Sequence, residues 1–296
     1  MIPFVRQFDF EYGRPAQVSP LIRRVIADNP GPFTFTGTGT YIVGHGEVAV
    51  IDPGPDDERH LNALLKAVKG ETVTHVLVTH THLDHSPLAR PFADATGATI
   101  YAARPPAPDD GPGVIVEEGD DGRFRPDVEI GDGAVFEGHG WTLETVATPG
   151  HASNHLCFAL REENALFSGD HVMGWSTTVV SPPDGDMGAY YESLDKVAAR
   201  GFATLWPTHG PPVTDPGPFL AAYKAHRLER ERQILAELAK GPATIVEMVP
   251  VIYAAVDSWL WPAASHSMLA HLIHLVRTGT VTCEDEPTAK SLFRSL

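Results

Sequence analysis

The chain has 296 residues, of which 43% are hydrophobic and 20% charged, a composition typical of a globular protein with a sizeable core. Its formal net charge of -16 disfavours general affinity for nucleic-acid backbones, and the absence of a long apolar run excludes a transmembrane helix. The first ten residues lack the pattern of an export signal and the two cysteines have no spacing typical of a disulfide framework, so we expect a cytoplasmic protein.

The first 216 residues alternate short apolar runs with turn signals. Strands are predicted where β-branched and aromatic residues gather, over residues 40–44, 48–52, 72–78, 98–102, 141–147, 155–160, 164–168 and 203–206. Helices are predicted over residues 56–69, 87–97 and 188–200. We expect Ser86 to cap the second helix and Gly97 to end it. These elements predict an α/β or α+β sandwich with sheets inside and helices outside.

The pattern becomes helical in the last part of the chain. Helices are predicted over residues 219–240, 243–255 and 263–278, followed by two short strands within residues 279–293. Three helices followed by a β-hairpin is the order of a winged helix. Residues 217–296 carry equal numbers of acidic and basic side chains, so the whole negative excess lies in the first 216 residues. We therefore predict a larger domain over residues 1–216 and a small winged-helix domain over residues 217–296.

A motif rich in histidine and aspartate follows the predicted strand 72–78. In THTHLDH, His80 and His82 are two residues apart, so they face the same side of an extended chain. Asp84 and His85 come next in the turn, where the backbone can direct them at a second ion. The HxHxDH pattern is specific enough to favour a metal site over a solvated histidine-rich loop.

Three further residues of ligand type stand on turns after predicted strands. His151 follows a Pro-Gly turn, and Asp170 and His209 follow the strands at 164–168 and 203–206. Each one alone is weak evidence, because such residues are common in turns. Together with HxHxDH they form a set of imidazoles and carboxylates without a thiolate, which suits zinc, with manganese or iron as substitutes.

In this order the motifs resemble those of the metallo-β-lactamase superfamily, over roughly residues 18–215. The resemblance implies an αββα sandwich, as the catalytic domain, with two metal ions at one edge. It implies that the first ion is held by His80, His82 and His151, the second by Asp84, His85 and His209, and both by a bridging Asp170.

Four other polar residues are expected near these ligands or in the core. Asp52 matches the superfamily's acid behind the ligands, although a turn aspartate at the end of a strand explains it nearly as well. We expect His155 and His171 to support the ligands or to pack, rather than to bind metal. His75 lies within an apolar strand and is expected to be a hydrogen-bonded core histidine.

The expected chemistry is hydrolysis by a hydroxide that bridges two zinc ions. A water shared by two such ions loses a proton near neutral pH, one ion polarises a carbonyl or phosphoryl oxygen, and the other stabilises the leaving group. Asp84 is also our candidate catalytic residue. Two dications, two carboxylates and one hydroxide leave about one positive charge, which favours an anionic or acyl/ester-type substrate.

The resemblance also narrows the type of hydrolase. True β-lactamases of the superfamily lack the bridging acid that Asp170 would supply, and they are exported. The C-terminal helices resemble the winged helix of a branch that includes the β-lactamase-like protein 2 group, whose animal members are mitochondrial endoribonucleases. Thr177 and Thr178 match that group's paired threonines and are expected to line the pocket. Ser86-Pro87-Leu88 replaces the usual Ser-Gly-Gly, and we expect it to reshape the pocket.

Three functions fit these observations. The first is hydrolysis of a small carboxylic, thioester, ester or lactone substrate, and the second is cleavage of single-stranded RNA, which normally requires a basic groove. The third is DNA-binding regulation, but the expected recognition helix has Arg277 as its only basic residue besides histidines, so we expect no strong binding of duplex DNA. We expect the winged helix to serve the active site or a homo-oligomer. A closed apolar pocket would favour an acyl substrate, and a basic groove would favour RNA.

Overall fold

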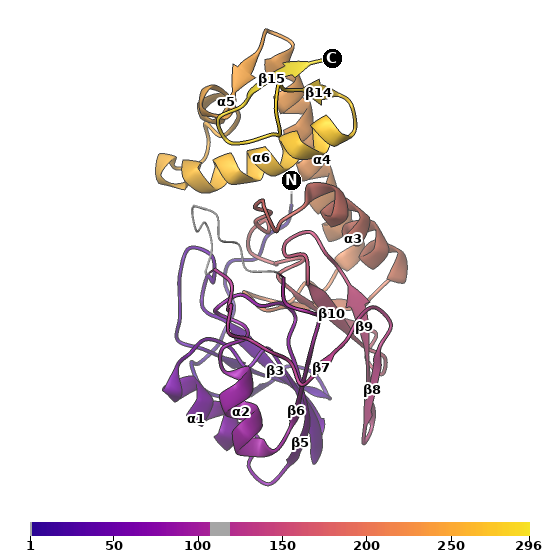
Figure 1. Cartoon of the computed structure of the whole chain (residues 1–296). Coiled ribbons are helices and arrows are strands. Elements are labelled where there is room, and N and C mark those ends of the chain that lie inside the picture. Colours follow the sequence, from indigo (N-terminus) through magenta and orange to yellow (C-terminus); the bar gives the residue numbers. More distant parts are fainter. Residues whose placement is uncertain (1, 107–118) are drawn as a thin grey trace.

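The computed structural model describes residues 2–106 and 119–296, and its larger part consists of two β-sheets covered by helices (Figure 1). Within the described residues, one sheet has its strands in chain order, and the other has the order β12-β11-β10-β9-β8. The first sheet contains β1 (Ala16–Gln17), β2 (Ile22–Ile26), β3 (Gly39–His45), β4 (Glu47–Ile51), β5 (Thr72–Leu77), β6 (Thr99–Ala102) and β7 (Val128–Glu129). The second contains β8 (Val135–Gly138), β9 (Trp141–Ala147), β10 (Leu156–Leu160), β11 (Ala165–Gly169) and β12 (Thr204–Pro207).

Alternating side chains explain why the sheets stack and are covered on both outer faces. Tyr41 and Val43 of β3 face the second sheet, whereas Ile42 between them packs toward the helices α1 (Glu58–Ala67) and α2 (Ala89–Thr96). The same period of two residues sorts the side chains of β4 and β10. The helix α3 (Met187–Arg200) and the first half of α4 (Pro216–Leu238) cover the other outer face. The expected αββα sandwich is confirmed.

The predicted strands of the first 216 residues agree with the observed ones to within about a residue, whereas most predicted helix starts differ from the observed ones by two or three residues. The second helix begins at Ala89 rather than beside Ser86. The Ser86 hydroxyl donates back to the carbonyl oxygen of His82 at 3.3 Å, so it holds the turn of the HxHxDH motif and does not cap the helix. Gly97 ends this helix in the left-handed conformation, as expected. The short strands β1, β2, β7 and β8 were not predicted, and neither was the strand Ala243–Thr244, which lies at the start of the predicted helix 243–255.

The C-terminal part has the expected winged-helix order. After α4 come β13 (Ala243–Thr244), α5 (Ile245–Ile252), a short 3-10 turn (Ser258–Leu260), α6 (Trp261–Arg277), β14 (Val281–Thr282) and β15 (Leu292–Ser295). These elements enclose a separate apolar core that includes Ile234, Met268 and Phe293. Within the described part of the chain, every helix is too short or too polar to cross a bilayer.

The helix α4 joins the two parts of the molecule. Its first half packs Phe219 and Tyr223 against the sandwich, and its second half packs Ile234 into the winged-helix core (Figure 1). Pro216 lies in the first turn of this helix, where proline is tolerated, so the helix runs across the predicted boundary. The domain boundary at residue 216 stays a prediction.

A buried carboxylate links α4 to α6. The Oε1 atom of Glu231 lies 3.2 Å from Nδ1 of His271 and 3.0 Å from Nδ1 of His274. Burial alone would raise the pKa of Glu231, but the two imidazoles lower it to about 2. The same contact with Glu231 raises the pKa of His274.

We predict that Glu231→Gln destabilises the protein most between pH 5 and 6.5. The contribution of Glu231 to the free energy of unfolding is present above its unfolded pKa of 4.5, and it is lost as the pH falls toward 2. The contribution of His274 is present below 6.5 and is lost as the pH rises through its raised pKa. Urea unfolding near pH 6 should show a loss of about 1–3 kcal/mol, shrinking at alkaline pH. Glu229→Gln, at a half-buried position of the same helix whose carboxylate pairs with Arg232, is the control, and equal effects of the two substitutions would contradict this account.

Candidate metal centre

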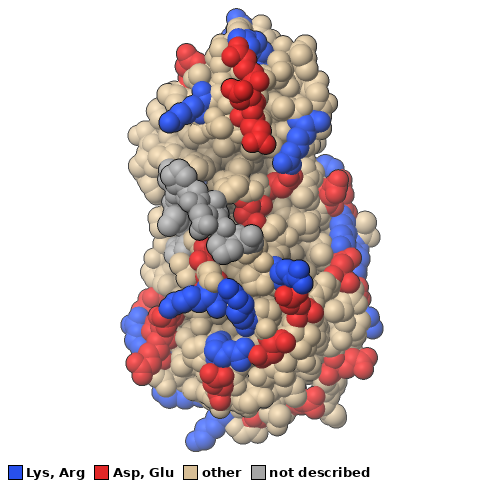
Figure 2. Space-filling view, in the orientation of Figure 1, with Lys and Arg blue, Asp and Glu red and all other residues tan. Residues whose placement is uncertain are grey.

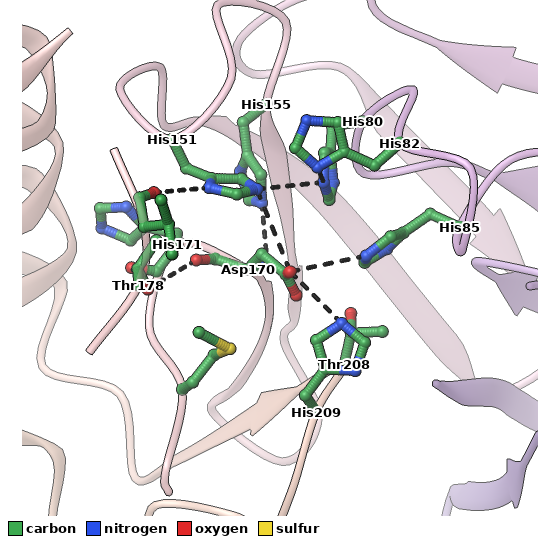
Figure 3. Close-up of polar contacts among 12 residues, drawn as sticks. His80, His82, His85, His151, His155, Asp170, His171, Thr178, Thr208 and His209 are labelled. Carbon is green, nitrogen blue, oxygen red and sulfur yellow. Dashed lines mark hydrogen bonds and ion pairs between the residues drawn. The ribbon is translucent and has the colours of Figure 1, made fainter. Parts of the chain in front are cut away.

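The predicted ligands lie at one edge of the sandwich, in the turns that follow β5, β9, β11 and β12, and Figure 3 labels all of them except Asp84. All of the seven residues come together, although they are as distant in sequence as His80 and His209. Their common position follows from the fold, because both sheets present these strand ends at the same edge. Their role as metal ligands stays a prediction.

Three imidazoles form the first group. Nε2 of His80 lies 2.9 Å from Nδ1 of His82 and 3.3 Å from Nε2 of His151. Burial, followed by the neighbouring histidines, holds the pKa of His80 well below its usual value. Burial also lowers the pKa of His82. Neutral imidazoles whose nitrogens converge are the donors that a divalent cation requires.

The second group contains Asp84, His85 and His209. Oδ2 of Asp84 lies 3.2 Å from Nε2 of His85 and 3.1 Å from Nε2 of His209. Burial alone would lower the pKa of His209, but Asp170 and Asp84 raise it to about 10. Burial would lower the pKa of His85 too, but Asp84, Asp170 and Asp52 hold it well above its usual value.

Asp170 lies between the two groups. Its Oδ2 atom is 3.3 Å from Nε2 of His209, 3.6 Å from Nε2 of His85 and 4.0 Å from Nε2 of His151 (Figure 3). Its Oδ1 atom is buried and has no hydrogen-bond partner among the residues that the structure describes. A carboxylate that reaches both groups is placed as a bridging ligand would be.

The outer nitrogens of the histidines are held by oxygen atoms. Nδ1 of His151 donates to the carbonyl oxygen of Val179 at 2.8 Å, and Nδ1 of His85 lies 2.9 Å from Oδ2 of Asp52. Such contacts fix the tautomer and point the other nitrogen toward the position of a metal. The donor atoms are all nitrogen or oxygen, and Oδ1 of Asp170 has no hydrogen-bond partner among the described residues. The residues therefore fit a pair of zinc, manganese or iron ions.

Two glycines allow ligand turns to adopt their positions. Gly150, at φ 140°, precedes His151, and a Cβ atom there would lie 2.5 Å from the backbone of Tyr190. Gly169, at φ 51°, precedes Asp170, and a Cβ atom there would lie 2.5 Å from Nε2 of His155. Any larger residue would push these turns away from their supports.

The supporting residues behave largely as expected. Nε2 of His155 accepts the backbone N–H of Asp170 at 3.1 Å, and burial holds the pKa of His155 well below its usual value. His171 packs on the ring of Tyr190, and burial lowers its pKa to about 3. His75 lies 2.7 Å from the hydroxyl of Thr74 within the strand.

A cavity of about 620 Å³ opens beside Asp84, Asp170 and His209. It is lined by Thr177 and Thr178, as expected. The Thr178 hydroxyl donates to the carbonyl oxygen of Asp170 at 2.8 Å, so this wall also supports the bridging residue.

The sequence did not reveal the aromatic walls of this cavity. Phe35 stacks on Trp175 with ring centroids 4.6 Å apart, and the winged-helix part contributes Tyr253 and Trp259. Arg227 of α4 lines the same cavity. These residues come from segments far apart in the chain and carry no shared motif. The positive φ of Phe35, 55°, is a strained conformation of the kind found at functional sites, but it is visible only in the structure.

Two family models match the two parts of the chain. The model of the metallo-beta-lactamase superfamily matches residues 34–209, and the model of the beta-lactamase associated winged helix domain matches residues 244–290. The lactamase-like protein adaB of Aspergillus niger is 31% identical, with 99% of this chain and 95% of that protein covered.

Two further proteins are similar in sequence or structure. An atrochrysone carboxyl ACP thioesterase of Aspergillus chevalieri is 34% identical, over 81% of this chain and 75% of that protein. A beta-lactamase domain protein from Burkholderia ambifaria superposes with a TM-score of 0.79 at 20% identity, covering 100% of this chain and 97% of that one. The second similarity concerns the fold alone.

We predict about two equivalents of zinc in protein that is purified without chelator, loaded with Zn²⁺ and desalted. His151→Ala should retain about one, because it removes a donor from the first group only. The exposed His139→Ala is the matched control and should retain two. Elemental analysis measures the content, and a single equivalent in the wild type would contradict the dinuclear interpretation.

Proposed function

The chain belongs to the metallo-β-lactamase superfamily, and from this premise we propose that it is a dinuclear zinc hydrolase of acyl thioesters whose acyl group is apolar and carries rings. The observation that carries the proposal is the cavity, because its aromatic walls lead directly to Asp84, Asp170 and His209. A volume of about 620 Å³ lies in the usual range for small-molecule sites. The relatives named as thioesterases support the same class of substrate.

The chemistry of the leaving group favours a thioester over an amide. When bound, the metal ions would lower the pKa of a water and polarise the substrate carbonyl. The water would release one proton to solvent and its oxygen would join the carbonyl carbon. The C–S bond would then break, and sulfur would leave with the bonding electrons, which gives a carboxylic acid and a thiolate. Thiols have a pKa of about 8.5, so the thiolate leaves without a strong general acid.

The chain's own residues would orient and enclose the reactants. We propose that Asp84 is the catalytic carboxylate that orients the attacking water, since it lines the cavity and accepts from the Thr38 hydroxyl at 3.1 Å. The stacked rings of Phe35 and Trp175 would bind a flat acyl group and exclude bulk water beside the carbonyl.

Cleavage of single-stranded RNA is less well supported. The cavity walls are mainly apolar and aromatic, and tracking of phosphates needs a basic groove. On the face shown in Figure 2, basic and acidic side chains are intermixed over both parts of the molecule.

We also propose that the winged helix completes the active site rather than binding DNA. The helix α6, which would enter the major groove in a DNA-binding protein, faces the sandwich: Ser267 lines the cavity, and Ala270 packs in the sandwich core. At its far end Arg277 pairs with Asp186. Docking of α6 into DNA would require these contacts to break.

The proposed activity is tested with metal-loaded enzyme and a panel of N-acetylcysteamine thioesters, lactones, a phosphodiester and single-stranded RNA. Aromatic thioesters should give the highest kcat/KM. Asp170→Ala should lower it by more than about 100-fold on every substrate, because loss of a supporting partner alone costs 10–100-fold. Hydrolysis of RNA with no thioesterase activity would reject the proposal.

Random duplex DNA should bind the full chain more weakly than about 10⁻⁴ M at physiological salt. The physical reason is that the chain is strongly acidic and α6 is covered. Fluorescence anisotropy measures the affinity. Micromolar binding that weakens steeply with added salt would instead support a DNA-binding role.

A further inference from the structure

Arg227 is a buried cation in the wall of the cavity. Only 4% of its surface is exposed, and it lines the cavity together with Thr178 and Ser267. Its Nη2 donates to the carbonyl oxygen of Thr178, and its Nη1 lies 3.5 Å from the Ser267 hydroxyl. Its Nε atom is buried without a hydrogen-bond partner in the part of the chain that the structure describes.

Among the residues that the structure describes, no carboxylate pairs with Arg227. The contacts of Arg227 are a carbonyl, a hydroxyl and the ring of Tyr190, and within residues 2–106 and 119–296 no ion pair joins it to a carboxylate. Glu231, one turn along α4, is engaged by His271 and His274. A buried charge without a partner is costly, so a protein normally retains it only where something else neutralises it.

We propose that Arg227 binds an anionic oxygen carried by the acyl group of the substrate, a carboxylate or an ionised phenol or enol. This inference rests on the proposed thioesterase function and adds the class of acyl group. A guanidinium provides several N–H donors in a plane, which suits an oxyanion in a desolvated pocket.

Burial decides which part of the substrate Arg227 meets. The leaving thiol must extend to solvent, whereas Arg227 lies at the inner wall where α4 approaches α6. Arg6 also lines the cavity but is exposed, so it belongs to the solvent side. The substrate therefore has its thioester at the metal centre, a flat body between aromatic walls and an anionic oxygen at the buried end.

The test compares the naphthoyl thioester of N-acetylcysteamine with a set of isomers that carry one carboxylate at different ring positions. Wild-type enzyme should prefer at least one carboxylated isomer. Arg227→Gln should lower kcat/KM for that isomer on the order of 30-fold, mainly through KM, and for the neutral thioester by less than about 3-fold. Arg227→Lys should keep part of the preference, because it keeps the charge. Arg232→Gln, an exposed arginine of the same helix, is the control and should change neither value.

A binding measurement separates this inference from the catalytic proposal. By calorimetry, metal-free wild-type protein should bind naphthalene dicarboxylate about tenfold more tightly than naphthoate, and Arg227→Gln should abolish the difference. If neither thioester is hydrolysed, the proposed function fails and the calorimetric comparison alone decides the role of Arg227. Equal wild-type binding of the two ligands, or equal losses in Arg227→Gln on charged and neutral thioesters, would overturn the inference.

Discussion

The candidate metal centre depends on one buried carboxylate, Asp52, at the end of β4. Its oxygens accept the backbone N–H and the hydroxyl of Thr79 at 2.8 Å each, the hydroxyl of Thr208 at 3.3 Å, and Nδ1 of His85 at 2.9 Å. These contacts tie the turn after β5 to the turn after β12, one in each sheet. Asp52 has a φ of 49°, a strained conformation for a residue with a side chain, which the surrounding contacts must hold.

The same arrangement explains how the winged helix takes part in a site built on another fold. The rigid helix α4 begins against the sandwich and ends in the winged-helix core, so it fixes α6 over the open edge where the ligands lie. The cavity is then lined by candidate metal ligands of the sandwich and, from α4 and the winged-helix part, by Tyr253, Trp259 and Arg227. In the proposed function, substrate selection and hydrolysis would depend on different parts of the chain.

Much of the site could be predicted because its candidate ligands stand in short, recognisable stretches of the sequence. HxHxDH concentrates four residues in a single turn, and His151, Asp170 and His209 each follow a recognisable strand. The cavity walls could not be predicted, because Phe35, Trp175 and Arg227 meet only through the docking of α4 and the loops. The wrong helix start at Ser86 has a similar cause: its hydroxyl turns back to His82, a tertiary requirement of the metal turn that overrides the local capping preference. Strand β2 was missed because Arg23 and Arg24 interrupt its apolar pattern.

The central claim is that one edge of this fold assembles two adjacent metal sites that share Asp170. Anomalous X-ray diffraction from crystals of zinc-loaded protein, collected above and below the zinc absorption edge, tests it most directly. The account predicts two anomalous peaks, one among His80, His82 and His151 and the other among Asp84, His85 and His209, with the Asp170 carboxylate between them. A single peak, or two peaks with Asp170 turned away from both, would contradict it.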